Sequence, residues 1–338
     1  YKSSPAPADS DHDGMPDTWE KKFSLKWNDP SDGAKDSDGD GYTNIEEWLN
    51  GTDPIQFVDY CKPENNVDTT HDERRQHDSM FVLNADSFKY HVDFFNTMEP
   101  ENIVNYISNA KSWLWMTENI PFFECPDKSF EQIYYFRWWT FRKHIKKTPD
   151  GFVFTEFLDK VGHSGKYNTI SCALGHHIYE GTWLRNNRYI DEYARFWYTG
   201  HEGGLQPHFH KYSNWGTWAL FRRYLVNQDK AFLPALLDAF VRDYEAWVEE
   251  HGLDNGLFWQ YDTRDGMEES ISGARREKNS RPPLNSYMYA NAAAISKIAQ
   301  MAGKEKLAAE YARRADKLKS LVNELTWDDQ AKFFKVQY

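Results

Sequence analysis

From about residue 90 the chain carries apolar residues at the three- and four-residue spacing of an amphipathic helix. In the stretch 232–252 this pattern stops at Gly252, a residue type that commonly ends helices. The residues placed on one face are Leu236, Ala239, Phe240, Tyr244 and Trp247. We therefore predict a long helix that buries this face in the core.

The same spacing predicts further helices on both sides of this one. Two prolines precede the stretch 284–303, which stops at Gly303, and the stretch 305–327 follows it. The stripe expected to be buried in 305–327 consists of Leu307, Tyr311, Ala315, Leu318, Val322 and Leu325. Shorter helices are predicted at 101–118, 129–145, 168–180, 187–198 and 213–227. Strand signals are sparse, and the best one is 151–157.

Successive helices joined by loops rich in Trp, Tyr, Arg and acidic residues are typical of an α/α toroid with its chemistry at one end. A helical bundle or a repeat solenoid is the alternative, but no fixed sequence period supports a solenoid. We predict a mostly α protein whose main domain spans residues 90–338 and forms such a toroid.

The N-terminal region has a different pattern, with two acid-rich stretches that match the calcium-loop motif D-x-[DN]-x-[DN]-G-x5-E. Alternate carboxylates on a curling loop supply the hard oxygens that calcium prefers, and the glycine permits the sharp turn. The expected ligands of the first loop are Asp9, Asp11, Asp13, Met15 through its carbonyl, Asp17 and Glu20. Those of the second loop are Asp36, Asp38, Asp40, Tyr42 through its carbonyl, Asn44 and Glu47. A disordered acidic tail is the alternative, which two full matches disfavour.

The flanking sequences "MPDTWE" and "NIEEWLNGTDP" resemble the bacterial thrombospondin type 3 repeat over about residues 9–54. This resemblance implies a structural Ca²⁺ module of a secreted, periplasmic or cell-surface bacterial protein. We expect a calcium-binding unit at 1–54 and a polar linker at 55–89.

Composition narrows the possible partners. The net charge of -12 argues against nucleic acid, because phosphate binding needs basic patches. No apolar run approaches the roughly 20 residues of a membrane span. The chain begins with Tyr1 rather than Met, so we expect that an upstream segment such as a signal peptide has been removed. Three cysteines, at positions 61, 125 and 172, are too few for a disulfide framework, although one disulfide remains open.

Candidate chemistry concentrates in the stretch "QYDTRDGMEESISGARR", residues 260–276. It places Asp265, Glu268 and Glu269 among glycines, next to aromatics and ahead of two arginines. Glycoside hydrolysis needs one carboxylic acid to protonate the leaving oxygen and a second carboxylate to activate water. Burial and neighbouring acids raise the pKa of one such group and keep it protonated near neutral pH. A solvated loop between helices is the alternative.

Three stretches, "GTWLRNNRYIDEYARFWYTG", "DTRDGMEESISG" and "RPPLNSYMYANAAAISKIAQMAG", resemble the six-hairpin (α/α)6 glycosidases. The similar families are the mannosylglycerate-hydrolase-like and family 63 glycoside hydrolases, and the resemblance covers about residues 100–338. By position it places Glu268 where the relatives carry their general acid, mostly an Asp, and Asp265 stays a rival for the role.

The resemblance also implies inversion at the anomeric carbon and a ring of twelve helices, with the general base in the last part of the ring. About eight helices are predicted before Tyr338. We therefore expect an incomplete toroid that a further segment completes, and we name no base.

Several aromatic and polar residues are predicted to contact substrate, since tryptophan faces stack on sugar rings and arginine grips hydroxyls or carboxylates. These residues are Arg137, Trp138, Trp139, Glu180, Trp183, Arg185, Trp259, Tyr261, Asn285 and Tyr287. The alternatives are a buried aromatic helix for 134–144 and a structural ion pair for Glu180 or Arg185.

Together these patterns predict a glycoside hydrolase that removes a terminal sugar from a plant or microbial oligo- or polysaccharide. One alternative is a non-catalytic, calcium-dependent carbohydrate-binding or scaffold protein. The other is a helical polysaccharide lyase that uses Tyr or His as base on uronic acids. The sugar stays open among α-glucoside, α-mannoside and arabinofuranoside.

Overall fold

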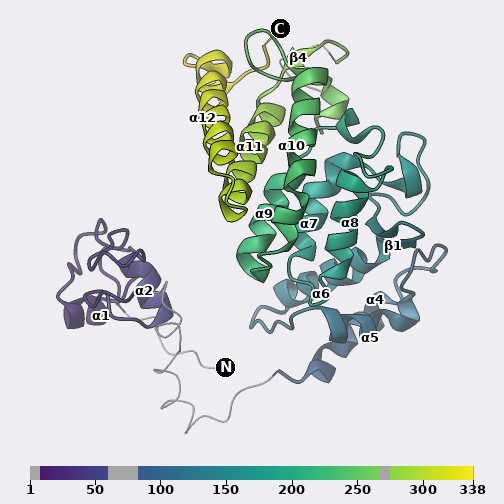
Figure 1. The fold of residues 1–338 in the computed structure, drawn as a ribbon. Helices are drawn as coiled ribbons and strands as arrows, with labels where there is room; N and C mark the ends of the chain where they lie inside the picture. The colour runs from purple at the N-terminus through teal and green to yellow at the C-terminus, as the bar shows by residue number, and fades with distance from the viewer. Residues whose placement is uncertain (1–7, 60–82, 267–274, 338) are drawn as a thin grey trace. The chain divides into compact units, whose positions relative to one another are not determined.

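The computed structural model describes residues 8–59, 83–266 and 275–337. The chain divides into two compact units, Tyr1–Val82 and Leu83–Tyr338 (Figure 1). Residues 60–82 of the predicted linker lie outside the described residues, and so does Cys61, while Cys125 and Cys172 are free thiols. Within the described ranges, none of the helices combines the length and the apolar character needed to traverse a lipid bilayer.

In the first unit, each acidic loop runs directly into a short helix. Helix α1 spans Asp17–Phe23 and helix α2 spans Asn44–Asn50. Thr43 caps α2 through a reciprocal pair of hydrogen bonds with Glu46, which fixes where the second loop ends and the helix begins. The two helices meet through Trp19 and Trp48, whose ring centroids are 5.5 Å apart.

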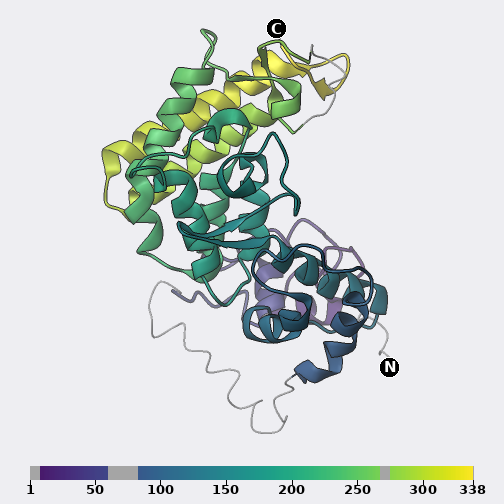
Figure 2. The same cartoon turned by 90° about the vertical axis from the view of Figure 1, so that its right-hand side faces the viewer.

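The second unit is built mainly from helical hairpins packed side by side (Figures 1 and 2). Three consecutive hairpins are α7 (Leu174–Gly181) with α8 (Arg188–Thr199), α9 (Gly216–Asn227) with α10 (Phe232–His251), and α11 (Pro282–Met301) with α12 (Glu305–Thr326). Helix α9 packs against both α7 and α11, while α10 contacts α8 and α11. The first helices of the hairpins thus form one layer and the second helices lie outside it, which is the predicted α/α toroid arrangement.

The N-terminal part of this unit consists of η2 (Ala85–Phe88), α4 (Lys89–Phe95), α5 (Asn109–Asn119) and α6 (Lys128–Lys143). An antiparallel hairpin of β1 (Ile145–Thr148) and β2 (Gly151–Phe154) then leads towards α7. Two further short pairs are β3 (Trp259–Gln260) with β4 (Asn279–Ser280), and β5 (Trp327–Asp328) with β6 (Phe333–Phe334). Single 3₁₀ turns are η3 (Lys166–Asn168), η4 (Ser171–Ala173), η5 (Phe209–Lys211) and η6 (Asp262–Arg264).

Helix positions largely follow the predicted periodicity. All five residues expected on the buried face of α10 are buried. Several expectations were wrong in detail: the helix predicted at 168–180 begins only at Leu174, and Leu307 of the predicted stripe is only partly buried. The helix predicted at 101–118 begins only at Asn109, because Glu101 folds back to accept a hydrogen bond from the Asn109 amide (2.6 Å). Leu325 in α12 is 38% exposed, because the buried stripe continues from Val322 to Thr326, four residues on.

Glycines allow the first helices of the hairpins to approach closely. A Cβ on Gly175 of α7 would lie 2.4 Å from the Trp215 ring, and one on Gly216 of α9 would lie 2.6 Å from Leu174. Since real Cβ atoms do not tolerate such contacts, larger residues would push α7 and α9 apart. This close approach of α7 and α9 places the N-terminal ends of the two helices next to each other.

A buried ionic network ties the loop between α8 and α9 to helix α10. His210 Nε2 lies 2.9 Å from Asp243 and its Nδ1 lies 3.0 Å from Glu250. Burial opposes a charge on this imidazole, but the two carboxylates outweigh it and raise the pKa of His210 to about 9. The histidine is therefore charged at neutral pH, and its ring packs against Trp247 at a tilt of 41°.

We expect His210→Ala to destabilise the protein by about 3–5 kcal/mol, because it leaves the buried Asp243 without its cationic partner. The raised pKa stabilises the fold fully below the unfolded value of about 6.5, and this contribution disappears as pH rises through about 9. Denaturant unfolding at pH 7 and pH 10 measures both effects. His201→Ala, at an exposed position, is the control. An equal loss of stability in the two variants would contradict the assignment.

Candidate active site and calcium loops

A cavity of about 330 Å³ lies at the N-terminal ends of α7, α9 and α11. The residues that line it are Glu156, Cys172, Ala173, His176, Ser213, Asp265, Gly266, Pro283 and Tyr287. They come from the segments that precede or begin these three helices, and from the loops after β2 and η6. Because the helix starts converge, residues more than 100 positions apart in the sequence share one pocket.

Asp265 is the buried acid of this cavity, with only 5% of its surface exposed. Burial raises the pKa of Asp265 to about 6, although the neighbouring Ser213 hydroxyl and the Arg281 guanidinium both lower it. Its Oδ1 atom and Ser213 Oγ are buried, and neither makes a hydrogen bond of good geometry within the described residues, although the hydroxyl lies close enough to Asp265 to lower its pKa. Both residues line the cavity.

Arg281 fixes the carboxylate of Asp265 by a charged hydrogen bond. Its Nε donates to Asp265 Oδ2 (3.1 Å), and its Nη1 donates to Asp262. All three side chains are buried, so the arginine is fixed between two carboxylates where α11 begins. Such a pair at least partly compensates the cost of burying an arginine, and it orients the carboxyl group of Asp265.

Sequence reasoning identified Asp265 and Tyr287 in this cavity but missed Glu156, His176 and Ser213. Glu156 follows β2 directly, and its Oε2 lies 3.6 Å from the Cys172 thiol. No local pattern marks these residues, because Glu156 and Ser213 belong to connecting segments and His176 lies in the first turn of α7. Glu268, the position matched to the relatives' acid, and its neighbour Glu269 lie outside the described residues.

A second cavity, of about 350 Å³, brings together four predicted substrate-contact residues. It is lined by Tyr134, Arg137, Trp138, Phe141, Tyr179, Glu180 and Trp183. Arg137 and Glu180 form an ion pair across it, while 57% of Trp183 and 39% of Tyr179 are exposed. Helix α7 serves both cavities, since His176 lines the first and Glu180, one turn or about 6 Å further along, lines the second.

Other predicted contact residues lie elsewhere and have structural partners. Trp139 is buried and donates to Asn96 (2.8 Å), while Arg185 donates to the carbonyl of Thr117 at the end of α5 (3.2 Å). Asn285 is fully buried and bonds the backbone of Phe258 in both directions, which fixes the segment before β3 against α11. Trp259 is buried in β3 between His251 and Tyr261. Neither cavity is lined by any of these five predicted contact residues, which are Trp139, Arg185, Trp259, Tyr261 and Asn285.

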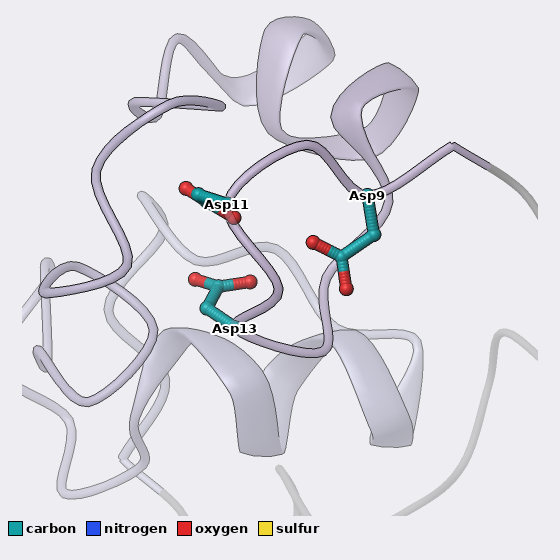
Figure 3. A group of neighbouring side chains, drawn as sticks. All are labelled: Asp9, Asp11 and Asp13. Atoms are coloured by element: carbon teal, nitrogen blue, oxygen red, sulfur yellow. The ribbon is translucent and has the colours of Figure 1, made fainter.

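The two acidic loops of the first unit have the same internal hydrogen bonds. Asp9 accepts from the amides of His12 and Gly14, and Asp36 accepts likewise from Gly39 and Gly41, three and five residues on. These bonds curl each loop until alternate carboxylates face one another. Figure 3 shows Asp9, Asp11 and Asp13 on one such loop, with oxygens within 4.8 Å of one another. The same holds for Asp36, Asp38 and Asp40.

Several oxygens in these loops and in the segment between them are buried and have no hydrogen-bond partner in the described part of the chain. They are both carboxylate oxygens of Asp11 and of Glu20, and one side-chain oxygen each of Asp13, Asp32, Asp38, Asp40, Asn44 and Glu47. Burial, followed by repulsion from neighbouring aspartates, raises the pKa of Glu20 and of Glu47 to about 7. Unpartnered oxygens crowded in this way fit a hard divalent cation, which takes six to eight oxygen ligands.

Comparisons with known proteins find a match in each of the two units. The model of the mannosylglycerate hydrolase MGH1-like glycoside hydrolase domain matches residues 166–338. The model of the bacterial TSP3 repeat, a calcium-binding repeat, matches residues 36–56. No curated protein matches the chain.

Among solved structures, one named "Sialidase" is 48% identical, with a TM-score of 0.73. The match covers 75% of this chain and 24% of that chain, so this chain spans about a quarter of the length of that protein.

Calcium removal tests the loops directly. We expect EDTA to lower the unfolding temperature of the first unit, because the crowded carboxylates then repel one another without a cation. At a free calcium concentration of 100 times Kd, each site contributes about 2.7 kcal/mol. Calorimetry of the full chain with calcium, with EDTA and with magnesium measures this, magnesium being the control that fits a flexible oxygen cage poorly. An unfolding profile that EDTA leaves unchanged would rule out a stabilising cation.

Proposed function

Because the chain belongs to the mannosylglycerate hydrolase MGH1-like glycoside hydrolase family, we propose that it takes part in cleaving a terminal sugar from a glycan with inversion. The observation that carries this proposal is the buried carboxyl group of Asp265 in the lining of the 330 Å³ cavity, whose Oδ1 makes no hydrogen bond of good geometry within the described residues. A concave cavity with a few polar groups among apolar ones suits a single sugar ring better than a polymer lying across a surface.

Asp265 and Glu268 are the two candidates for the general acid. With its pKa raised to about 6, Asp265 is protonated in a larger share of molecules near neutral pH than an ordinary aspartic acid, and can donate a proton to the leaving oxygen. Its bond to Arg281 fixes one oxygen and leaves the other for substrate. Glu268 is supported by its position in the family motif. The flanking Gly266 has a φ of 71°, a left-handed conformation that turns the chain sharply between the two acids.

The choice of sugar stays broad. The family name points to an α-mannoside, and the name of the 48% identical protein points to a sialylated glycan. α-Glucosides and arabinofuranosides complete the set to be tested.

We assign the second cavity to a further sugar unit of the same glycan. Five of its seven lining residues are aromatic, and the Arg137–Glu180 pair offers a donor and an acceptor for hydroxyl groups. The shared helix α7 supports this assignment, because it places the two cavities along one helix face.

The calcium loops would serve stability, and the enzyme would work outside the cytoplasm. A cation held by carboxylates from a loop and its following helix fixes that loop without taking part in the reaction. Bacterial TSP3 repeats of this type support a secreted, periplasmic or cell-surface location.

The first test is sugar release from α-mannosides, α-glucosides, arabinofuranosides and sialylated glycans, by the wild type and by Asp265→Asn and Glu268→Gln. We expect the variant at the general acid to lose at least about 100-fold in kcat, since general acid catalysis contributes about 10²–10⁴-fold. If Asp265 is the acid, the wild-type rate falls as pH rises through about 6, because the protonated form is then lost.

The outcomes distinguish the candidates. Loss only in Glu268→Gln would remove Asp265 from the role of acid. Sugar release that persists in both variants would reject both residues. Glycan binding with no release from any substrate would favour the carbohydrate-binding alternative, and products that absorb in the near ultraviolet would favour a lyase.

The second test concerns the aromatic cavity. We expect Trp183→Ala to lower kcat/KM about fivefold on glycans of three or more units, because a stacking contact is worth about 1 kcal/mol. The shortest substrate should be unaffected. Trp327→Ala, which removes a 38% exposed tryptophan in β5, is the matched control. An equal effect on short and long substrates would contradict a distal sugar position.

A further inference from the structure

The ninth position of the first acidic loop is occupied by Asp17, and both oxygens of this side chain are already engaged. Oδ1 accepts from the Ser10 amide (2.7 Å) and Oδ2 from the Ser10 hydroxyl (2.8 Å). Lys21 also donates to Oδ2 (3.3 Å). In the second loop the ninth residue is Asn44, whose Oδ1 is buried and has no hydrogen-bond partner in the described part of the chain.

Another acid lies where the ninth ligand of the first loop would be needed. Asp32 is 4% exposed, and its Oδ1 has no hydrogen-bond partner among the described residues. One oxygen each of Asp13, Glu20 and Asp32 lie within 4.8 Å of one another. The Lys26 amide holds the other oxygen of Asp32 (2.7 Å), so the unpartnered one is fixed in place.

Gly33 lets the backbone next to Asp32 come close to the first acidic loop. A Cβ on Gly33 would lie 2.7 Å from Asp13 Oδ2, closer than real Cβ atoms come. Only a glycine at this position lets residues 32 and 33 reach the first loop without displacing Asp13. Glu20, the last residue of the first motif, is fully buried, and both of its carboxylate oxygens have no hydrogen-bond partner within the described residues.

We infer that Asp32, and not Asp17, completes the calcium site of the first loop, together with Asp13 and Glu20. This site is distinct from the segment 36–56 matched by the repeat model. The inference concerns calcium binding alone and does not depend on the proposed hydrolysis.

The same residue links the two loops. The carbonyl oxygen of Asp32 accepts from Asn44 Nδ2 (2.9 Å) and from the Lys35 amide (2.9 Å), and the Gly33 carbonyl accepts from the Ile45 amide (3.1 Å). Asn44 begins α2 and holds the ninth position of the second loop. A cation in either loop therefore fixes the segment 32–35 that the other loop needs, and calcium binds to the two loops with positive cooperativity.

Calcium titration of the full chain by isothermal calorimetry tests the inference by setting two variants against each other. Asp32→Asn keeps the size of the side chain but removes its charge, and it should lower the affinity of one site at least about tenfold and abolish cooperativity. Asp17→Asn is the matched control, and it should leave both affinities within about twofold. The calcium-loop motif alone predicts the opposite outcome, in which Asp17→Asn weakens calcium binding and Asp32→Asn does not.

Gly33→Ala is an independent variant that keeps every carboxylate. Its added methyl group displaces Asp13 or Asp32, so it should weaken the same site, and circular dichroism in saturating calcium reports whether each variant is folded. If Asp32→Asn does not fold, the Gly33→Ala titration decides. Unchanged binding in the folded variants, or a loss in Asp17→Asn as large as in Asp32→Asn, would overturn the inference.

Discussion

The candidate active site depends on one buried arginine. Arg281 lies between Asp262 and Asp265 and bonds both, which joins the η6 turn to the first residue before α11. An arginine that is 2% exposed has lost its hydration, so it needs these carboxylates, and they in turn need its charge. This mutual dependence places the carboxyl group of Asp265 at the start of α11, where the helix layer opens into a cavity.

The other residues of the site lie at or before the N-terminal ends of the toroid helices, or in the loops that follow β2 and η6. Close contacts at Gly175 and Gly216 bring α7 and α9 together, and α11 packs against α9. Segments that precede three successive helices therefore meet, although they are far apart in the sequence. Loops can differ in chemistry while the helix layer stays fixed, which is why functional residues gather at such ends.

Buried carboxylates differ between the two units in whether they have a cationic side chain as partner. In the second unit a buried acid has a cationic side chain as partner, as Asp265 has Arg281 and Asp243 has His210. In the first unit Glu20 and Asp32 have buried oxygens with no partner within the described residues. Uncompensated charge of this kind is costly in a folded protein, so it indicates a ligand that supplies positive charge.

The sequence by itself determined most helices and both acidic loops, because their signals are local. Helical periodicity placed α10 to within a residue, and the spacing of alternate aspartates predicted loops that curl as the structure shows. It also singled out Asp265, and Trp138 and Trp183 among the aromatic residues of the second cavity. It could not separate Trp138, which lines that cavity, from its neighbour Trp139, which packs in the core.

Tertiary structure decided which residues meet. Glu156 and Ser213 join Asp265 only through the packing of separate hairpins, and Arg281 reaches it only through the fold of the connection between α10 and α11. Asp32 reaches the first loop because Gly33 lacks a side chain. Such contacts depend on the three-dimensional path of the chain between distant positions, and no spacing within the sequence encodes that path. The chemistry of each residue can be read from the chain, but its partners follow from the fold.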